Sequence, residues 1–170
     1  MDKFEQLYRE NALLIKYYIL NMCGCMFTSD DIVQETFYKT FLYIRRFENV
    51  QINRQWLIKA AHHTFIDHYR KQKNEAGAVS FEALAEINHL SRALITSTES
   101  YEARIVINET ISKLPVNYRT VILLKDYYGF SIKEIASILG YSESNVKVVM
   151  HRARKRFREE YDKYEKQHEL

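Results

Sequence analysis

Apolar residues recur at intervals of three and four along most of the chain, which is the spacing that buries one face of an α-helix. The chain has four glycines and one proline, so few positions must interrupt a helix. This pattern predicts an all-helical protein. The expected helices cover residues 4–22, 30–44, 54–73, 101–114 and 115–128, followed by two more between 131 and 158.

Ser29 comes directly before the second of these helices and is expected to cap it, because a serine hydroxyl can accept a hydrogen bond from the first turn. Gly24 is expected to end the helix before it. The segment DDIVQETF follows Ser29 and begins the second helix. One side of this helix is apolar and expected to be buried, and its other side is polar and is by default a solvated surface.

Residues 131–158 (SIKEIASILGYSESNVKVVMHRARKRFR) predict two helices joined by a tight turn. Ser131 and Glu134 form the sequence pattern of a capping box, and Gly140 stands where the first helix must stop. Ser142 is placed to cap the second helix. A short helix, a glycine-containing turn and a basic second helix are typical of the helix-turn-helix, whose second helix enters the major groove of DNA.

The second of these helices has an apolar stripe and an outward face with several basic residues. Helical spacing places seven residues on the outward face: Ser144, Lys147, Val148, His151, Arg152, Lys155 and Arg158. The alternative interpretation is an amphipathic hairpin with a solvated basic face. We favour DNA binding because the turn, the cap and the one-sided charge agree.

Charge and periodicity divide the chain into three parts, although the net charge is only +3. Residues 1–74 and 101–170 are mildly basic and strongly periodic. Residues 75–100 carry Arg92 as their single basic residue and lose the periodicity. Hydrophobic residues make up 46% of the chain, enough for buried cores. We expect two small helical domains, 1–74 and 101–170, joined by an acidic linker with one or two helical turns.

The helix over residues 54–73 places basic and aromatic groups together. Lys59, His63, Asp67 and Arg70 lie on or beside one face, with Trp56 at its edge. Such a face can bind phosphates and stack unpaired bases. Taken alone the signal is weak, and packing in the core is the commoner role of a tryptophan.

Other chemistry has little support in the sequence. Cys23 and Cys25 are too close for a structural disulfide, and no second pair completes a zinc site. The spacing of His63 and Asp67 permits chelation, but no third ligand is apparent, and histidines near a basic face are expected to be polar surface. We expect no catalytic residue, no metal and no cofactor. No signal peptide or membrane-length apolar run is visible, so a cytoplasmic protein is expected.

Three segments in this order resemble a known family. DDIVQETF (30–37) is similar to a core-polymerase-binding segment, WLIKAAHHTFIDHYR (56–70) to a segment that recognises the minus-ten promoter element, and residues 114–157 to a domain that recognises the minus-thirty-five element. The chain resembles bacterial RNA polymerase sigma factors of the extracytoplasmic-function (ECF) group in the sigma-70 family. The resemblance implies a factor that binds core RNA polymerase, directs it to specific promoters and helps to initiate transcription.

The resemblance also implies roles for particular residues. The face that docks on the clamp coiled coil of the largest polymerase subunit would hold Asp31, Gln34, Glu35, Phe37 and Tyr38. Lys59, His63, Asp67 and Arg70 would hold the non-template strand of the minus-ten element. The seven outward residues of the second helix of the helix-turn-helix would contact the minus-thirty-five element. The flap of the second-largest polymerase subunit and an anti-sigma factor are further implied partners, and a small-molecule substrate is not.

Two positions depart from the family pattern W-L-x-x-I-A-x-N. Ala60 stands at the usual isoleucine and His63 at the usual asparagine. Histidine can stack and hydrogen-bond, but its donors and acceptors differ from those of asparagine. A different base preference and a neighbouring residue taking over the contact are both open.

Two other classes of function explain less of the sequence. A stand-alone helix-turn-helix regulator would account for residues 131–158 but would leave DDIVQETF and WLIKAAHH unexplained, and it should bind its operator tightly without polymerase. An enzyme using the histidines between residues 62 and 68 would have to bind stoichiometric metal or turn over a substrate.

Overall fold

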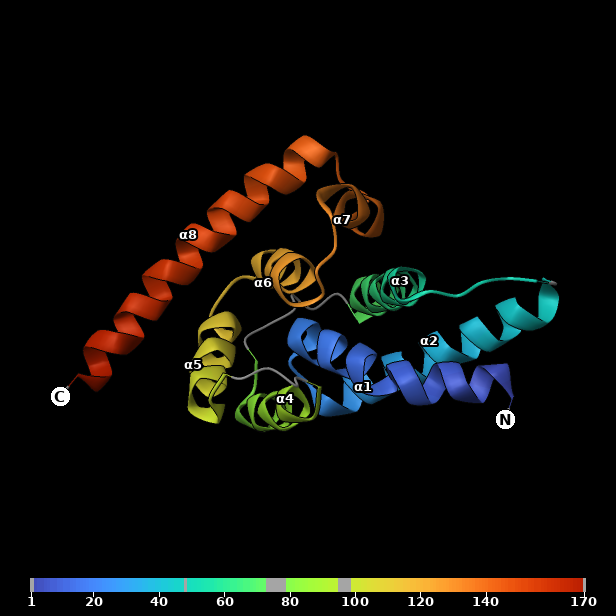
Figure 1. Ribbon diagram of the computed structural model, residues 1–170, viewed down its shortest axis with the longest axis horizontal. Helices are drawn as coiled ribbons and strands as arrows, with labels where there is room; N and C mark the ends of the chain where they lie inside the picture. Colours follow the sequence, from blue (N-terminus) through green and yellow to red (C-terminus); the bar gives the residue numbers. More distant parts are fainter. Residues whose placement is uncertain (1, 48, 73–78, 95–98, 170) are drawn as a thin grey trace.

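The computed structural model of the chain describes residues 2–47, 49–72, 79–94 and 99–169, and within these ranges it contains helices and no strand (Figure 1). The all-helical class is therefore confirmed. The elements are α1 (Lys3–Cys23), α2 (Met26–Arg46), α3 (Arg54–Gln72), α4 (Phe81–Leu94), α5 (Tyr101–Ser112), α6 (Val116–Ile122), the π-helical turn η1 (Leu123–Tyr127), α7 (Ile132–Leu139) and α8 (Glu143–His168).

Helices α1, α2 and α3 pack on one another to form the amino-terminal domain (Figure 1). Gly24 ends α1 in the left-handed conformation, with φ of 65°, which a glycine adopts at little cost. The sharp turn there lets α2 fold back along α1. The side chains buried between the three helices include Ile15, Ile19, Ile32, Leu57, Ile58 and Ala61.

The predicted cap of α2 is wrong. The helix begins at Met26, with Cys25 at the cap position, and Ser29 lies fully buried inside the helix. Its hydroxyl donates a hydrogen bond of 2.8 Å to the carbonyl oxygen of Met26. A serine hydroxyl can donate a hydrogen bond to a backbone carbonyl of the preceding turn within a helix, so a serine alone does not show where a helix begins.

Helix α4 lies in the segment that the sequence predicts to be a linker, and it is longer than the expected turn or two. Ala83, Ile87 and Leu90 are buried where α4 packs against α1 and α5. Glu86 is partly buried and pairs with Lys16 of α1 at 3.6 Å. This acidic segment is thus part of the packed fold.

Helices α5 to α8 form the carboxy-terminal domain, in which α8 packs against α5, α6 and α7. Its core includes Val121, Leu124, Ile135, Ile138, Val146, Met150 and Ala153. Helix α8 continues beyond the predicted helix-turn-helix, through a charged segment, as far as His168. Glu160 stabilises this extension by ion pairs with Arg156 at 3.0 Å and Lys163 at 3.1 Å.

The two domains lie directly against each other. Helix α7 packs on α3, and α6 packs on α1, so that the carboxy-terminal domain covers one side of the amino-terminal domain (Figure 1). The first helix of the helix-turn-helix is therefore close to the helix predicted to bind the minus-ten element.

Candidate nucleic-acid interface

The helix-turn-helix forms as its local sequence signals predict. The N–H of Glu134 donates to the hydroxyl of Ser131 at 3.1 Å, and the N–H of Ser131 donates to the Glu134 carboxylate at 2.7 Å. Gly140 ends α7 with φ of 69°. The N–H of Asn145 then donates to the hydroxyl of Ser142, which caps α8. These caps fix the direction in which α8 leaves the turn.

The outward face of α8 is open to solvent. All seven residues predicted there are exposed, and the opposite stripe, which includes Val146 and Met150, is buried. Lys147, His151, Lys155 and others border a hollow of about 540 Å³ on this face. A face of this kind can attract phosphates, and its exposed side chains near the start of the helix can reach base edges.

Two other arginines of α8 are engaged with acids of the protein itself. Arg154 forms an ion pair of 2.7 Å with Asp126 of η1. Arg156 pairs with Glu160 within α8. These two arginines are not among the residues predicted to contact DNA.

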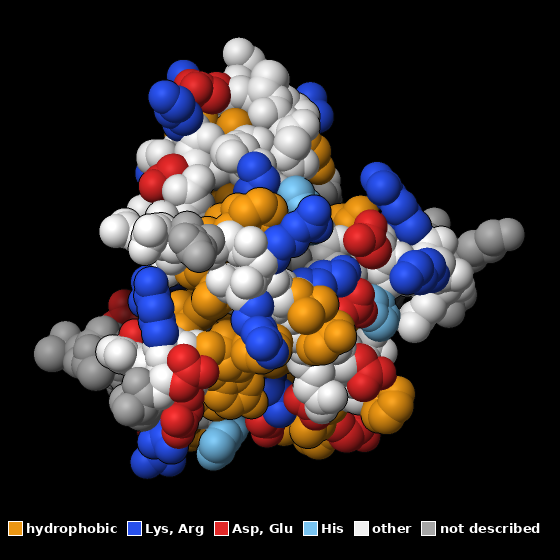
Figure 2. Space-filling view, turned by 90° about the vertical axis from the view of Figure 1, so that its right-hand side faces the viewer, with side chains coloured by type: hydrophobic (Ala, Val, Ile, Leu, Met, Phe, Trp, Pro, Cys, Tyr) orange, Lys and Arg blue, Asp and Glu red, His pale blue; other side chains and the backbone are white. Residues whose placement is uncertain are grey.

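The predicted minus-ten residues lie together on α3, beside the carboxy-terminal domain. His63, Asp67 and Arg70 are exposed and border a cavity of about 550 Å³, which Tyr141 borders from the other domain. Lys59 is half-buried and donates a hydrogen bond of 3.1 Å to a serine of α7. Figure 2 shows Lys and Arg side chains on both the upper part of the molecule, around the helix-turn-helix, and the amino-terminal helices below.

Trp56 and His62 serve the packing of the amino-terminal domain. Trp56 is half-buried, with its ring 5.1 Å from that of Tyr43. His62, expected on the polar surface, is 8% exposed, and its Nδ1 lies 2.9 Å from the hydroxyl of Tyr18. Burial, and secondarily the charge of His63, lowers the pKa of His62 to about 4, so the imidazole is neutral near pH 7. Among the described residues, no group of His, Cys, Asp and Glu is arranged to hold a metal ion.

Four of the five α2 residues predicted to face the polymerase are at least partly exposed, and the fifth is buried. Asp31, Gln34 and Tyr38 are exposed and Glu35 is partly exposed. Phe37 is 3% exposed, and its ring packs against aromatic rings of α1, so it cannot contact a partner in this conformation. Its side of the helix points into the core.

Two features near α2 went unrecognised in the sequence. Leu42 is 47% exposed and lies four positions after Tyr38, so helical spacing was the signal that could have found it. Glu35 accepts from Lys39 at 2.7 Å and lies 2.8 Å from Nε2 of His68 on α3. These partners, with Lys39 the largest influence, lower the pKa of Glu35.

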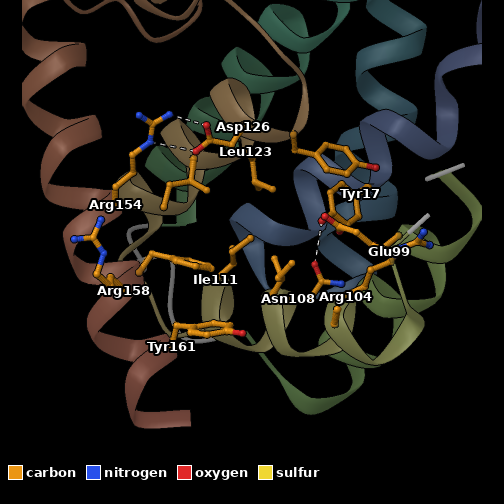
Figure 3. Close-up of a pocket in the computed structure, with 16 residues that line it drawn as sticks. Tyr17, Glu99, Arg104, Asn108, Ile111, Leu123, Asp126, Arg154, Arg158 and Tyr161 are labelled. Atoms are coloured by element: carbon orange, nitrogen blue, oxygen red, sulfur yellow. Dashed lines mark hydrogen bonds and ion pairs between the residues drawn. The ribbon is translucent and has the colours of Figure 1, made fainter. Parts of the chain in front are cut away.

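A further cavity, of about 650 Å³, lies between α1, α5, η1 and α8 (Figure 3). Ile107, Ile111, Leu123 and other apolar side chains line much of it. The hydroxyl of Tyr17 donates to Oδ1 of Asn108 at 3.2 Å beside this space. No motif in the sequence indicates this cavity, because its walls come from both domains.

Comparison with known proteins agrees with this geometry. Residues 7–75 match the family described as sigma-70 region 2, and residues 104–157 match sigma-70, region 4. The chain is 32% identical over 157 residues to the RNA polymerase sigma factor YlaC of Bacillus subtilis, covering 90% of this chain and 88% of YlaC. The chain belongs to the ECF group of the sigma-70 family. As a sigma factor it directs RNA polymerase to promoters, and a stand-alone regulator is not favoured.

Other sigma factors are similar over most of their length. The ECF sigma factor SigM of Bacillus subtilis is 28% identical, with 96% of each chain covered. Among solved structures, the sigma factor RpoE in complex with the anti-sigma factor NepR from Bartonella quintana has a TM-score of 0.69 at 18% identity. That alignment covers 95% of this chain and 98% of RpoE, which shows a shared fold.

No helix within the described residues is long and apolar enough to span a membrane.

Proposed function

We propose that this sigma factor divides three contacts among three helices. The exposed face of α2 docks on the clamp coiled coil of core RNA polymerase, α3 holds the minus-ten element, and α8 recognises the minus-thirty-five element. The observation that carries the proposal is the capped helix-turn-helix, whose second helix exposes all seven predicted residues.

The docking face on α2 consists of Asp31, Gln34, Glu35 and Tyr38, extended by Leu42. A mixture of acidic groups, an aromatic ring and an aliphatic side chain suits a protein partner, since aromatic anchors dominate interface energies and charges guide association. Phe37 supports this face from beneath. The flap of the second-largest subunit is a second contact, to the carboxy-terminal domain.

The minus-ten contacts on α3 come from Lys59, His63, Asp67 and Arg70. Taking a base out of the stack costs on the order of a few kcal/mol, and stacking on a protein side chain returns roughly 1–3 kcal/mol per base. This near balance means that melting occurs only when polymerase also holds the duplex. His63 replaces the asparagine of the family, and we propose that its ring stacks on a captured base.

The minus-thirty-five contacts on α8 divide by their distance from its start. Ser144, Lys147, Val148, His151 and Arg152 lie near the amino-terminal end, where a recognition helix reaches base edges. A bidentate contact to one base is worth about 1–3 kcal/mol of discrimination. Lys155 and Arg158 lie further along and contact phosphates.

An anti-sigma factor is a further proposed partner. RpoE, similar in fold, was solved with the anti-sigma factor NepR, and CnrH, also similar in fold, was solved with the cytosolic domain of CnrY. We further propose that the factor acts in the cytoplasm, where polymerase and the chromosome are, and that it has no catalytic residues of its own.

In vitro transcription tests the proposal. Purified core polymerase, with and without this protein, is given genomic DNA fragments, and the RNA start sites are sequenced. We expect new start sites that require both components and share two upstream elements. Tight binding of the protein alone to DNA, without new start sites, would support the stand-alone regulator instead.

A further inference from the structure

Cys23 and Cys25 lie on either side of the glycine that joins α1 to α2. Cys23 is the last residue of α1, Gly24 is in the left-handed conformation with φ of 65° and ψ of 15°, and Cys25 occupies the cap position of α2. Cys23 is partly buried and Cys25 is exposed. They are the two cysteines of the chain, and neither belongs to the proposed polymerase or DNA contacts.

The turn at Gly24 brings the two cysteines within the range of a disulfide. A right-handed α-helix places Cα atoms two positions apart at a distance of about 5.4 Å, and the left-handed conformation of Gly24 gives the mirror image, with the same separation between Cys23 and Cys25. Disulfides join Cα atoms that are about 4.4–6.8 Å apart. The Sγ–H of Cys23 already reaches across the turn, because it donates to the carbonyl oxygen of Cys25 at 3.2 Å.

The two thiols differ in how readily they ionise. Burial raises the pKa of the Cys23 thiol from its ordinary value of 9.0 to about 11. The backbone N–H and the hydroxyl of Thr28, in the first turn of α2, lower the pKa of the exposed Cys25 thiol below 9.0. At pH 7 this difference gives Cys25 a thiolate fraction at least about a hundredfold larger than that of Cys23. A less basic thiolate is a weaker nucleophile, by about tenfold for this difference, so the net advantage of Cys25 is at least about tenfold.

A buried arginine of α6 acts on the thiol of Cys23. Arg119 is 1% exposed, and its Nε has no hydrogen-bond partner among the described residues. Its positive charge favours the thiolate of Cys23, although burial has the larger influence on the pKa of that thiol. A cation near a thiol stabilises the anion that forms when the sulfur attacks. Cys23 is therefore suited to a second step that follows a reaction of Cys25 with a reagent from solvent.

We propose that Cys25 is the site at which a hydroperoxide oxidises this protein, and that Cys23 converts the product to a reversible disulfide. In the first step the Cys25 thiolate attacks a peroxide oxygen. An S–O bond forms, the O–O bond breaks, and the leaving hydroxide takes up a proton to become water. The sulfur is oxidised to a sulfenic acid, and the peroxide is reduced.

The second step takes place within the turn. The sulfur of Cys23 attacks the sulfur of Cys25, an S–S bond forms, and the S–O bond breaks. The departing hydroxide leaves as water with the proton of the Cys23 thiol. The two steps together consume one peroxide and two thiols and produce one disulfide and two waters.

The bridge is labile, in contrast to a structural disulfide. It closes a loop of three residues, and so short a loop adds little to the stability of the fold. Strained or exposed disulfides are the ones that thiol reductants open most readily. Reduced glutathione therefore restores both thiols. This modification goes beyond the proposed function, because it requires neither polymerase nor DNA.

Mass spectrometry after thiol alkylation tests the proposal on the reduced protein. Hydrogen peroxide is added, free thiols are blocked with iodoacetamide, and the intact chain and its tryptic peptide 17–39, which holds both cysteines, are weighed. We expect a monomer that has lost two hydrogen atoms and takes up no iodoacetamide, and we expect reduced glutathione to restore both alkylation sites. Oxidation of Met22 or Met26 in the same peptide adds oxygen, so mass distinguishes it from the bridge.

Single replacements separate the roles of the two cysteines. Cys23→Ser, with Cys23→Ala as a second variant in case the partly buried serine disturbs folding, leaves Cys25 without a partner, and dimedone should trap its sulfenic acid. Cys25→Ser leaves Cys23 alone, and its reaction with hydrogen peroxide should be at least about tenfold slower than that of Cys25 in the Cys23 variants. Circular dichroism checks that each variant keeps its helical content.

Three results would overturn the proposal. Thiols of the wild type that stay reduced with peroxide, while a small free thiol in the same tube is oxidised, would show that the turn is not a site of oxidation. A disulfide between two molecules as the main product would show that Cys23 does not act on Cys25. Equal rates of oxidation for Cys23 and Cys25 in the single variants would remove the assignment of Cys25 as the first thiol to react.

Discussion

Tyr128 and Leu14 join the two domains through one buried hydrogen bond. The phenol of Tyr128, in the carboxy-terminal domain, donates to the backbone carbonyl of Leu14 in α1 at 2.9 Å. Burial raises the pKa of this phenol well above its ordinary value of 10, so it remains a donor at any physiological pH. The bond spans 114 positions of sequence, and it forms only when the domains are together.

Tyr128→Phe should destabilise the folded protein by about 0.5–1.5 kcal/mol, because it removes the donor and keeps the ring. Urea unfolding followed by circular dichroism measures the change. Tyr141→Phe is the matched control, since Tyr141 is exposed. Equal loss of stability in both variants would show that the bond to Leu14 contributes nothing specific.

The stability of the protein should fall as the pH is lowered from about 7 to about 4, and His62 should be one cause. In the unfolded chain this histidine takes up a proton near its ordinary pKa of 6.5, whereas burial lowers the folded pKa to about 4. Between these values the unfolded state binds the proton more readily, so folding becomes less favourable as the pH falls. The full effect is about 3 kcal/mol.

Urea unfolding at a series of pH values, with His62→Gln beside the wild type, isolates this contribution. Glutamine keeps a hydrogen-bonding group near Tyr18 and does not titrate. We expect the difference in stability between the two proteins to change in favour of the variant at low pH. A difference that stays constant from pH 7 to pH 4 would rule out His62 as a source of the pH dependence.

Local signals in the sequence were sufficient for the class of fold and for the helix-turn-helix. Ser131, Glu134 and Gly140 act within one or two turns of chain, so their roles can be predicted without knowledge of tertiary structure. The outward face of α8 follows from helical spacing for the same reason. The four residues predicted to bind the minus-ten element lie on α3, on the side next to the carboxy-terminal domain.

The remaining features depend on contacts between distant segments. Phe37 and His62 are buried because particular side chains of α1 lie against them, and periodicity alone cannot identify these neighbours. Helix α4 was underestimated because its acidic residues suggested a solvated linker, whereas its apolar stripe packs on α1. The contact between the two domains could not be predicted from local sequence patterns, since nothing in the helical spacing distinguishes its tyrosines from other residues of an amphipathic helix.

Charge reversal on α2 should weaken the binding of core polymerase. Asp31→Lys changes an exposed carboxylate on the proposed docking face, and we expect a loss on the order of 1 kcal/mol, or about fivefold in affinity. Glu35→Lys should cost more, because it also breaks the contacts with Lys39 and His68.

Competition with a labelled reference sigma factor for core polymerase measures these affinities. Asp162→Lys, on the exposed carboxy-terminal part of α8, makes the same change of charge away from the docking face. Since the net charge changes equally, nonspecific electrostatics would weaken all of the variants alike. Asp31→Lys and Glu35→Lys variants that bind as tightly as the Asp162→Lys control would remove α2 from the polymerase interface.

Arg152→Ala should weaken promoter use and leave polymerase binding intact. Arg152 is exposed on the outward face of α8 near its start, where a guanidinium can donate two hydrogen bonds to one base. Losing such a contact should cost about 1–3 kcal/mol of discrimination at one position of the minus-thirty-five element. Transcription from the cognate promoter and from single-base variants of that element measures it, with Lys166→Ala as a control that removes an equal charge far along the same helix.

Arg152→Ala should reduce transcription most on the cognate promoter and level the differences among the single-base variants, because a base contact carries sequence information and a phosphate contact does not. A uniform loss across all promoters would instead assign Arg152 to a phosphate, and an unchanged yield would remove it from the interface.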